Sequence, residues 1–253
     1  FGGDDLRSGG FAVGGPLVSA RPDELMMRLA IQQSNSDGFR RNLTLKRDTN
    51  ARDEFNSRLR FTWNPNTLWR WDAALLYADQ HDGYDEFALD NNGRYTYSDQ
   101  PGVDNQRSLA GSLRGVYRGW DVARFTTVTS AARTDSRYSY DDDWTAASYM
   151  GFSDLSRRRW VVNEELRLDS ERAPAKAFSR WTLGAFYSGI DETTRYTDSD
   201  PGNIRGLKTA YHSTNVALFG QAAFALASHT RLIAGLRAER IDLRGDGLKT
   251  RYR

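Results

Sequence analysis

The sequence has no cysteine, only 3 histidines and 6 prolines in 253 residues, and no long apolar run. The absence of cysteine excludes disulfide frameworks, thiolate metal sites and cysteine nucleophiles. No segment approaches the roughly 18 consecutive apolar residues that a membrane-spanning helix requires. Taken alone, the mean hydropathy of −0.69 therefore indicates a soluble protein. The 35 basic and 33 acidic side chains give no global reason to expect nucleic acid as a partner.

The two ends of the chain carry neither an initiating nor a terminating pattern. Phe1 is followed by Gly2-Gly3-Asp4-Asp5 without the basic and apolar regions of a secretory signal, and the sequence stops at Arg253. We expect the chain to be a piece of a longer polypeptide.

Two-residue alternation recurs along the whole chain, whereas helical periodicity is nearly absent. The pattern predicts an all-β protein with strands of roughly 10–13 residues. That length exceeds the roughly 5–6 residues of ordinary sheets and matches the roughly 9–11 of tilted membrane strands. The expected strands cover 9–18, 24–35, 53–64, 69–79, 107–118, 120–134, 159–169, 180–189, 214–226 and 231–240.

Short and long connections alternate between these strands. Short breaks fall at Ser19–Asp23, Asn64–Thr67, Gly119, Ser170–Ser179 and Ser228-His229, and long polar stretches at 36–52, 80–106, 135–158 and 192–212. Strict alternation is typical of an outer-membrane barrel, which has tight periplasmic turns and long external loops. Sandwiches and propellers show no such parity.

A soluble barrel or sandwich with one half-buried face remains the alternative. Glu164 and Arg240 argue for it, because both fall on the nominally apolar faces of their strands. We expect Glu164 to mark a register shift or bulge within 159–169.

The tryptophans favour the membrane interpretation. Rings that flank short turns can form an aromatic girdle at one headgroup layer, and rings nearer the long loops can form the opposite girdle. The first group is Trp63, Trp69, Trp71, Trp120 and Trp181, and the second is Trp160, Tyr77, Tyr138 and Tyr187.

Several stretches resemble the barrel of TonB-dependent outer-membrane receptors. They are Ser36–Phe39, Arg52–Pro65, Asp82–Asp85 with Leu89–Asn91, Asn163–Leu168 before Trp181–Tyr187, and the pair Ala217–Phe224 and Ala234–Glu239, while Val13–Leu17 resembles the start of such a barrel. The resemblance implies an antiparallel transmembrane β-barrel of about 22 strands around a globular plug. It further implies that 1–253 is a partial barrel domain of about ten strands, with the plug, the TonB box and the C-terminal strands absent.

The resemblance also implies a function: ligand capture at the surface of a Gram-negative bacterium and TonB-coupled import across the outer membrane. Ferric siderophores or similar iron complexes are the expected ligands, and other nutrients are the alternative. Loop aromatics that can stack on a ligand are Tyr84, Tyr95, Tyr97, Tyr138, Tyr140 and Trp144. The competing interpretation is that these rings pack on each other and order the loops.

The expected partners are the lipid bilayer, lipopolysaccharide, the nutrient ligand, and the TonB complex through an N-terminal region outside this chain. Basic residues at the loop bases that can pair with lipopolysaccharide phosphates are Arg107, Arg157, Arg158, Arg159, Arg205 and Lys208. An ordinary charge-balanced rim would show the same residues. Neither a cofactor nor a metal is expected, because the acidic loop residues follow no EF-hand spacing.

Enzymatic function finds no support. His81, His212 and His229 are scattered over two expected loops and a turn, and no G-x-S-x-G, phosphate-binding glycine loop or H-E-x-x-H motif is present. Two other functions stay open: a passive porin-like channel and a soluble carbohydrate-binding β-domain.

Overall fold

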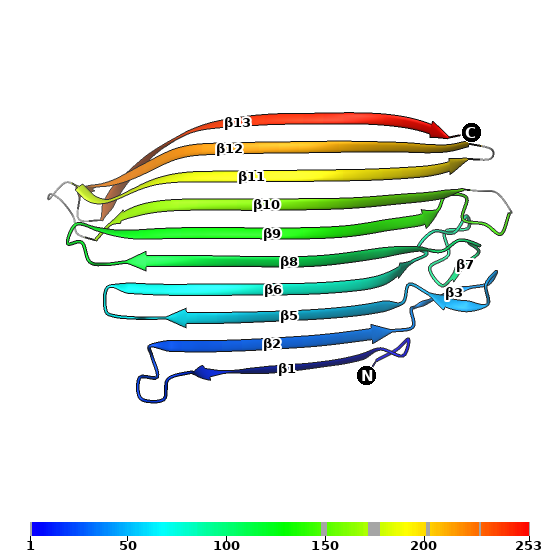
Figure 1. Ribbon diagram of the computed structural model, residues 1–253, viewed down its shortest axis with the longest axis horizontal. Coiled ribbons are helices and arrows are strands. Elements are labelled where there is room, and N and C mark those ends of the chain that lie inside the picture. The colour runs from blue at the N-terminus through cyan, green and yellow to red at the C-terminus, as the bar shows by residue number, and fades with distance from the viewer. Residues whose placement is uncertain (1, 148–150, 172–177, 201–202, 228, 253) are drawn as a thin grey trace.

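A computed structural model describes residues 2–147, 151–171, 178–200, 203–227 and 229–252. Its main element is a 10-stranded sheet in which sequential strands are antiparallel neighbours, in the order β1-β2-β5-β6-β8-β9-β10-β11-β12-β13 (Figure 1). The strands are β1 (Arg7–Pro16), β2 (Leu25–Ser36), β5 (Arg52–Trp63), β6 (Trp69–Tyr84), β8 (Gly102–Tyr117), β9 (Ala123–Asp141), β10 (Phe152–Ser170), β11 (Phe178–Asp200), β12 (Asn203–Ala227) and β13 (Thr230–Tyr252). The all-β prediction and the ten expected strands are confirmed.

The connections lie as the alternation predicts. In Figure 1 the turns after β1, β5 and β8 lie at one end of the sheet, and the longer connections after β2, β6 and β9 lie at the other. A second sheet of three short strands, β3 (Arg40–Asn42), β4 (Arg47–Thr49) and β7 (Tyr95–Thr96), forms within the longer connections. No helix in the described ranges is long and apolar enough to cross a membrane.

The strand register gathers the apolar side chains on one face of the sheet, here called the apolar face. One cross-strand row reads Val13, Leu29, Leu59, Leu75, Gly111, Ala131 and Val162 from β1 to β10. Side chains on this face are strongly exposed, Leu109 at 58% and Leu236 at 87%. The buried apolar residues of the described chain are only Ala78, Val116, Ala123, Ala217 and Ala223. The apolar face therefore has no covering layer within the described structure.

The long connections are shorter than expected. The stretch 192–212 is not a loop, because β11 continues to Asp200 and pairs with β12 from Asn203 onward. Likewise β9 and β10 reach into 135–158, and β6 and β8 reach into 80–106. These extensions are mostly polar, and their few apolar side chains follow no sustained two-residue period, so they lack the apolar alternation that reveals a strand. The expected breaks at Ser170–Ser179 and Ser228-His229 lie partly outside the described residues.

The bulge expected at Glu164 is wrong. β10 pairs in unbroken register with both neighbours, and Glu164 lies opposite Thr129 on one side and Tyr187 on the other. Its carboxylate stays on the apolar face and accepts hydrogen bonds from Thr127 Oγ1 (2.8 Å) and from Thr129 Oγ1. Two neighbouring hydroxyls thus satisfy the charge that a bulge was expected to relocate.

Candidate membrane face and ligand platform

The apolar face forms a band of the height that a bilayer needs. On β6 the side chains of this face are Trp69, Trp71, Ala73, Leu75 and Tyr77, followed by Asp79. Eight residue steps at ~3.4 Å span roughly 27 Å along the strand. At a tilt of roughly 40° this corresponds to about 21 Å, close to the roughly 25 Å apolar band of outer-membrane barrels.

Aromatic rings line the short-turn edge of this band. Trp69 and Trp71 stack with centroids 5.2 Å apart, and Trp69 also contacts Tyr117 at 4.7 Å. The line continues from Tyr117 to Trp120 at 5.3 Å and to Phe125 at 6.3 Å. The structure therefore joins three of the predicted turn-flanking tryptophans, Trp69 and Trp71 on β6 and Trp120 in the turn after β8, into a continuous aromatic edge.

Charged side chains line the opposite edge of the band. Asp79, Arg107, Asp135 and Arg158 occupy one cross-strand row of the apolar face, with alternating sign. Arg107 pairs with Asp79 at 3.2 Å and Arg158 with Asp135 at 2.7 Å. Because these pairs are partly exposed, each contributes only about 0–1 kcal/mol, and they mark the polar boundary more than they stabilise it.

Strand alternation divides the basic residues that were expected together. Arg107 and Arg158 belong to the apolar face, whereas Arg157 and Arg159 belong to the opposite face, here called the polar face. Both of the latter pair with Glu192, at 3.5 and 2.6 Å. A hollow of about 390 Å³ lies at the charged edge of the apolar band, and its lining includes Arg107, Arg133, Arg137 and Arg158.

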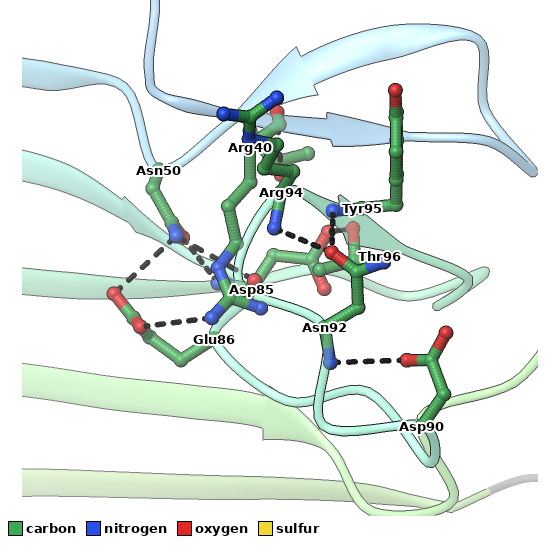
Figure 2. Close-up of polar contacts among 10 residues, drawn as sticks. Arg40, Asn50, Asp85, Glu86, Asp90, Asn92, Arg94, Tyr95 and Thr96 are labelled. Carbon is green, nitrogen blue, oxygen red and sulfur yellow. Dashed lines mark hydrogen bonds and ion pairs between the residues drawn. The ribbon is translucent and has the colours of Figure 1, made fainter.

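The connections 37–51, 85–101 and 142–147, here called the loop platform, are held together by a buried carboxylate. Asp85 Oδ2 accepts hydrogen bonds from Asn42 Nδ2 at 3.0 Å and from Thr96 Oγ1 at 2.5 Å. Asn50 Oδ1 accepts the Asp85 backbone N–H at 2.5 Å, and Asn50 Nδ2 donates to Glu86 (Figure 2). Asn42 and Thr96 are fully buried and Asp85 is 5% exposed, so this network fixes the first two connections to each other.

A second buried carboxylate, Asp141, ties in the third connection. Asp141 Oδ2 accepts a hydrogen bond from Ser98 Oγ at 2.7 Å, and Oδ1 accepts the backbone N–H groups of Asp143 and Trp144. Burial is the main reason that the pKa of Asp141 lies above its usual range, although the Ser98 hydrogen bond opposes the shift. The turn that follows holds Trp144 at φ +57°.

These networks support a cluster of aromatic rings around Phe87. Phe87 stacks on Trp144 at 5.0 Å and contacts Tyr84 at 5.9 Å and Tyr140 at 6.1 Å. Tyr138 completes the cluster through Tyr84 at 4.7 Å and Tyr140 at 5.5 Å. Burial, followed by the Tyr84 hydroxyl, raises the pKa of Tyr138 well above its usual range, so the hydroxyl stays protonated.

The cluster contains four of the candidate ligand residues, namely Tyr84, Tyr138, Tyr140 and Trp144, and these rings do pack on one another. Tyr95 and Tyr97 lie apart from it: Tyr95 is 41% exposed on β7, and the Tyr97 hydroxyl lies 3.4 Å from Asp90. Phe87, which is 39% exposed, was not among the candidate residues identified from the sequence. The sequence signal that could have identified it is Tyr84, three residues earlier at the end of β6.

No group of three or more histidine, aspartate or glutamate side chains in the described part of the chain is arranged to hold a metal ion. His81 and His212 lie in β6 and β12, not in loops as expected, and each neighbours one aspartate, Asp79 at 3.7 Å and Asp191 at 2.6 Å.

Comparison with known proteins gives no match to a family model and none to a curated protein. Solved structures do match. The ferric yersiniabactin uptake receptor FyuA from Yersinia pestis superposes with a TM-score of 0.79 at 12% identity, over 99% of this chain and 41% of FyuA. The ferric citrate transporter FecA matches with a TM-score of 0.57 at 11% identity, over 97% of this chain and 38% of FecA.

The ferric-catecholate import receptor Fiu from E. coli K12 also matches, with a TM-score of 0.57 at 10% identity, over 98% of this chain and 50% of Fiu. The chain thus spans half or less of each of these proteins. At such low identity the likeness shows the fold, and the fold is that of part of a TonB-dependent receptor barrel.

Proposed function

We propose that this chain is part of an outer-membrane receptor of a Gram-negative bacterium, which binds a ferric siderophore or similar iron complex and imports it in a TonB-coupled manner. The observation that carries the proposal is the single apolar face, maintained through the register of ten strands and bounded by aromatic rings and charges. In this proposal residues 1–253 are a partial barrel domain. The plug, the TonB box and the C-terminal strands belong to other parts of the protein.

The faces and ends of the sheet then acquire an orientation. The apolar face contacts lipid, and the polar face lines the lumen. The short turns lie in the periplasm and the loop platform lies outside the cell, as in outer-membrane barrels generally. Arginines in the hollow above the band lie at headgroup level, where guanidinium groups can pair with the phosphates of lipopolysaccharide.

The Phe87 cluster is the proposed ligand-binding surface. Tyr84, Tyr138 and Tyr140 belong by strand alternation to the polar face, and Phe87 and Trp144 lie in the connections beyond it. Aromatic faces at this position can stack on the aryl groups of a chelator, while Asp85 and Asp141 keep the supporting connections in place. Tyr95, which is exposed and has no ring partner in the described structure, remains a further proposed contact.

Uptake by the complete protein in its native membrane tests this proposal. Cells are supplied separately with a ferric catecholate and with ferric citrate carrying radioactive iron. Phe87→Ala is expected to raise the half-saturating concentration of one of these two iron complexes by about tenfold, because the variant loses one aromatic contact and its packing. The matched control, Phe39→Ala, removes an exposed ring outside the cluster and should leave uptake unchanged.

Two alternative functions predict different results, one in the uptake experiment and one in cell fractionation. Uptake that persists when the TonB complex is removed would indicate a passive channel and contradict coupled import. Recovery of the complete protein in the aqueous fraction without detergent would indicate a soluble β-domain and contradict the membrane placement altogether.

A further inference from the structure

The polar face carries three arginines without acidic partners near its short-turn end. Arg28 on β2 and Arg60 on β5 are direct cross-strand neighbours, and Arg58 lies two residues from Arg60 on the same face. All three are exposed, and no ion pair or side-chain hydrogen bond in the described structure involves them. By contrast, Arg70 and Arg114 on the same face share Asp72, at 2.8 and 3.4 Å.

This arrangement concentrates positive charge. Directly opposed residues in an antiparallel pair have Cβ atoms about 4.5–5.5 Å apart, and like charges at that distance destabilise the pair. Arg28 and Arg60 stand in that relation, and Arg58 adds a third charge on the diagonal. An anion bound between the guanidinium groups would remove the repulsion.

A hollow adjoins Arg58, one of the three arginines. It has a volume of about 450 Å³, and its lining on the polar face includes Gly10, Ala12, Ala30, Gln32, Asn56 and Arg58. Ala12, Ala30 and Arg58 form one cross-strand row, so the small side chains of β1 and β2 leave the space open beside the guanidinium group. The volume falls within the roughly 300–1,000 Å³ of small-molecule sites.

The hollow also offers neutral hydrogen-bonding groups. Gln32 and Asn56 face each other across β2 and β5, one row from Arg58 towards the loop end. Neither carboxamide has a side-chain hydrogen bond within the described ranges. Guanidinium groups bind carboxylate and phosphate in a bidentate manner, and amide N–H groups can donate to the remaining oxygens.

We propose that Arg28, Arg58 and Arg60, with the adjoining hollow, form a binding site for a small anionic solute that carries two or more carboxylate or phosphate groups. Three guanidinium groups within one cross-strand diagonal, about 7–8 Å, match several negative groups on one molecule better than a single one. The proposal does not depend on iron uptake, because equilibrium binding tests it without transport.

Arginine modification in the complete protein, purified in detergent micelles, tests the site. Phenylglyoxal reacts with accessible guanidinium groups, and mass spectrometry follows each residue. Citrate is the probe, with inorganic phosphate as the second. Reaction of Arg28, Arg58 and Arg60 is expected to slow by about tenfold when the citrate concentration is about nine times its dissociation constant, because only the unoccupied fraction then reacts. Reaction of exposed Arg21 should stay unchanged.

Calorimetric titration with citrate gives an independent readout. Arg58→Gln is expected to weaken binding by at least about tenfold, because the variant loses a charge-assisted hydrogen bond to the anion. Ala30→Leu, which keeps every charge but fills the hollow, should also weaken binding, and Arg21→Gln should not. The lack of citrate and phosphate protection would overturn the proposal. Arginines already unreactive before any anion is added would also overturn it, since another part of the protein would then supply the counter-charge.

Discussion

At Glu164 the two-residue alternation led to a wrong prediction of a β-bulge. It stands where the alternation of β10 requires an apolar side chain, and a bulge was the natural expectation. The structure keeps the register and satisfies the carboxylate with the hydroxyls of Thr127 and Thr129. Threonine on the neighbouring strand carries no signal in the sequence of β10, so only the cross-strand register reveals the pairing.

Replacement of Glu164 by leucine is expected to stabilise the complete protein in lipid. A charge on the lipid face carries a free-energy penalty, and its removal should raise the free energy of unfolding by about 1–2 kcal/mol. Urea unfolding in phospholipid vesicles measures the change. The neighbouring Glu165→Leu, on the polar face beside Arg167 at 3.6 Å, is the matched control and should bring no gain. Destabilisation by Glu164→Leu would contradict a lipid-facing β10.

Asp141 is expected to make the loop platform sensitive to pH. Burial raises the pKa of this carboxyl above its unfolded value, so the folded state binds the proton more tightly. The stabilisation is complete below the ordinary carboxyl pKa of about 4 and is lost as the pH rises through the raised value. Hydrogen-exchange protection of residues 142–147, corrected for intrinsic rates, should therefore increase as the pH falls from about 7 to about 4.

Asp141→Asn supplies the test of that assignment. The amide oxygen can still accept the N–H groups of Asp143 and Trp144, but it no longer titrates. The pH dependence should flatten without disappearing, because burial also raises the pKa of Asp142. An unchanged profile in the variant would show that another group controls the platform.

At the scale of elements, the sequence indicates strands well where they are amphipathic and poorly where they are not. The alternation of Leu109, Leu113 and Tyr117 with polar residues is enough to identify β8. The outer part of β11 is almost wholly polar, and in the outer part of β12 the apolar residues Ile204, Leu207 and Tyr211 do not keep to one face, so 192–212 resembled a loop. Their pairing depends on cross-strand hydrogen bonds, which a two-residue hydrophobic period does not record.

The loop platform is the other element that sequence reasoning missed. Asn42 lies 43 residues before Asp85, Thr96 lies 11 residues after it, and none of the three stands in a recognisable motif. Their convergence follows from the parallel pairing of β3 with β7. The aromatic candidates were identifiable by residue type, but Phe87 joins them only because this small sheet positions its connection.

Asp85→Ala is expected to loosen the platform. It removes the acceptor of the buried Thr96 hydroxyl and one of the two acceptors of the Asn42 amide, which keeps the Ser98 carbonyl at 2.8 Å. A buried polar group left unpaired costs about 1–3 kcal/mol. Hydrogen exchange of residues 37–51 and 85–101 should speed up accordingly, while β8 stays protected. Asp48→Ala, which removes a half-exposed pair with Arg41 at 3.2 Å, is the control and should change little. Equal effects of the two substitutions would show that Asp85 is not the centre of the platform.

At the scale of the whole molecule, the described chain has an exposed apolar face and almost no buried apolar core. The negative mean hydropathy that suggested a soluble protein is the average of an apolar face, a polar face and long polar strand extensions. The superposition with FyuA covers 99% of this chain and 41% of FyuA. The two-residue periodicity predicted the correct fold class, whereas the average hydropathy did not.

Nitroxide scanning of β8 in the complete protein, reconstituted in lipid vesicles, tests the lipid-facing assignment most directly. The 253 residues contain no cysteine, so labels can be placed singly at positions 108–116 without removing one from this segment. Labels replacing Leu109, Gly111 and Leu113 should be accessible to dissolved oxygen, and labels replacing Ser108, Ala110 and Ser112 to a water-soluble nickel chelate. This two-residue period is the predicted result. Equal access of the chelate to both sets would contradict a membrane-spanning sheet.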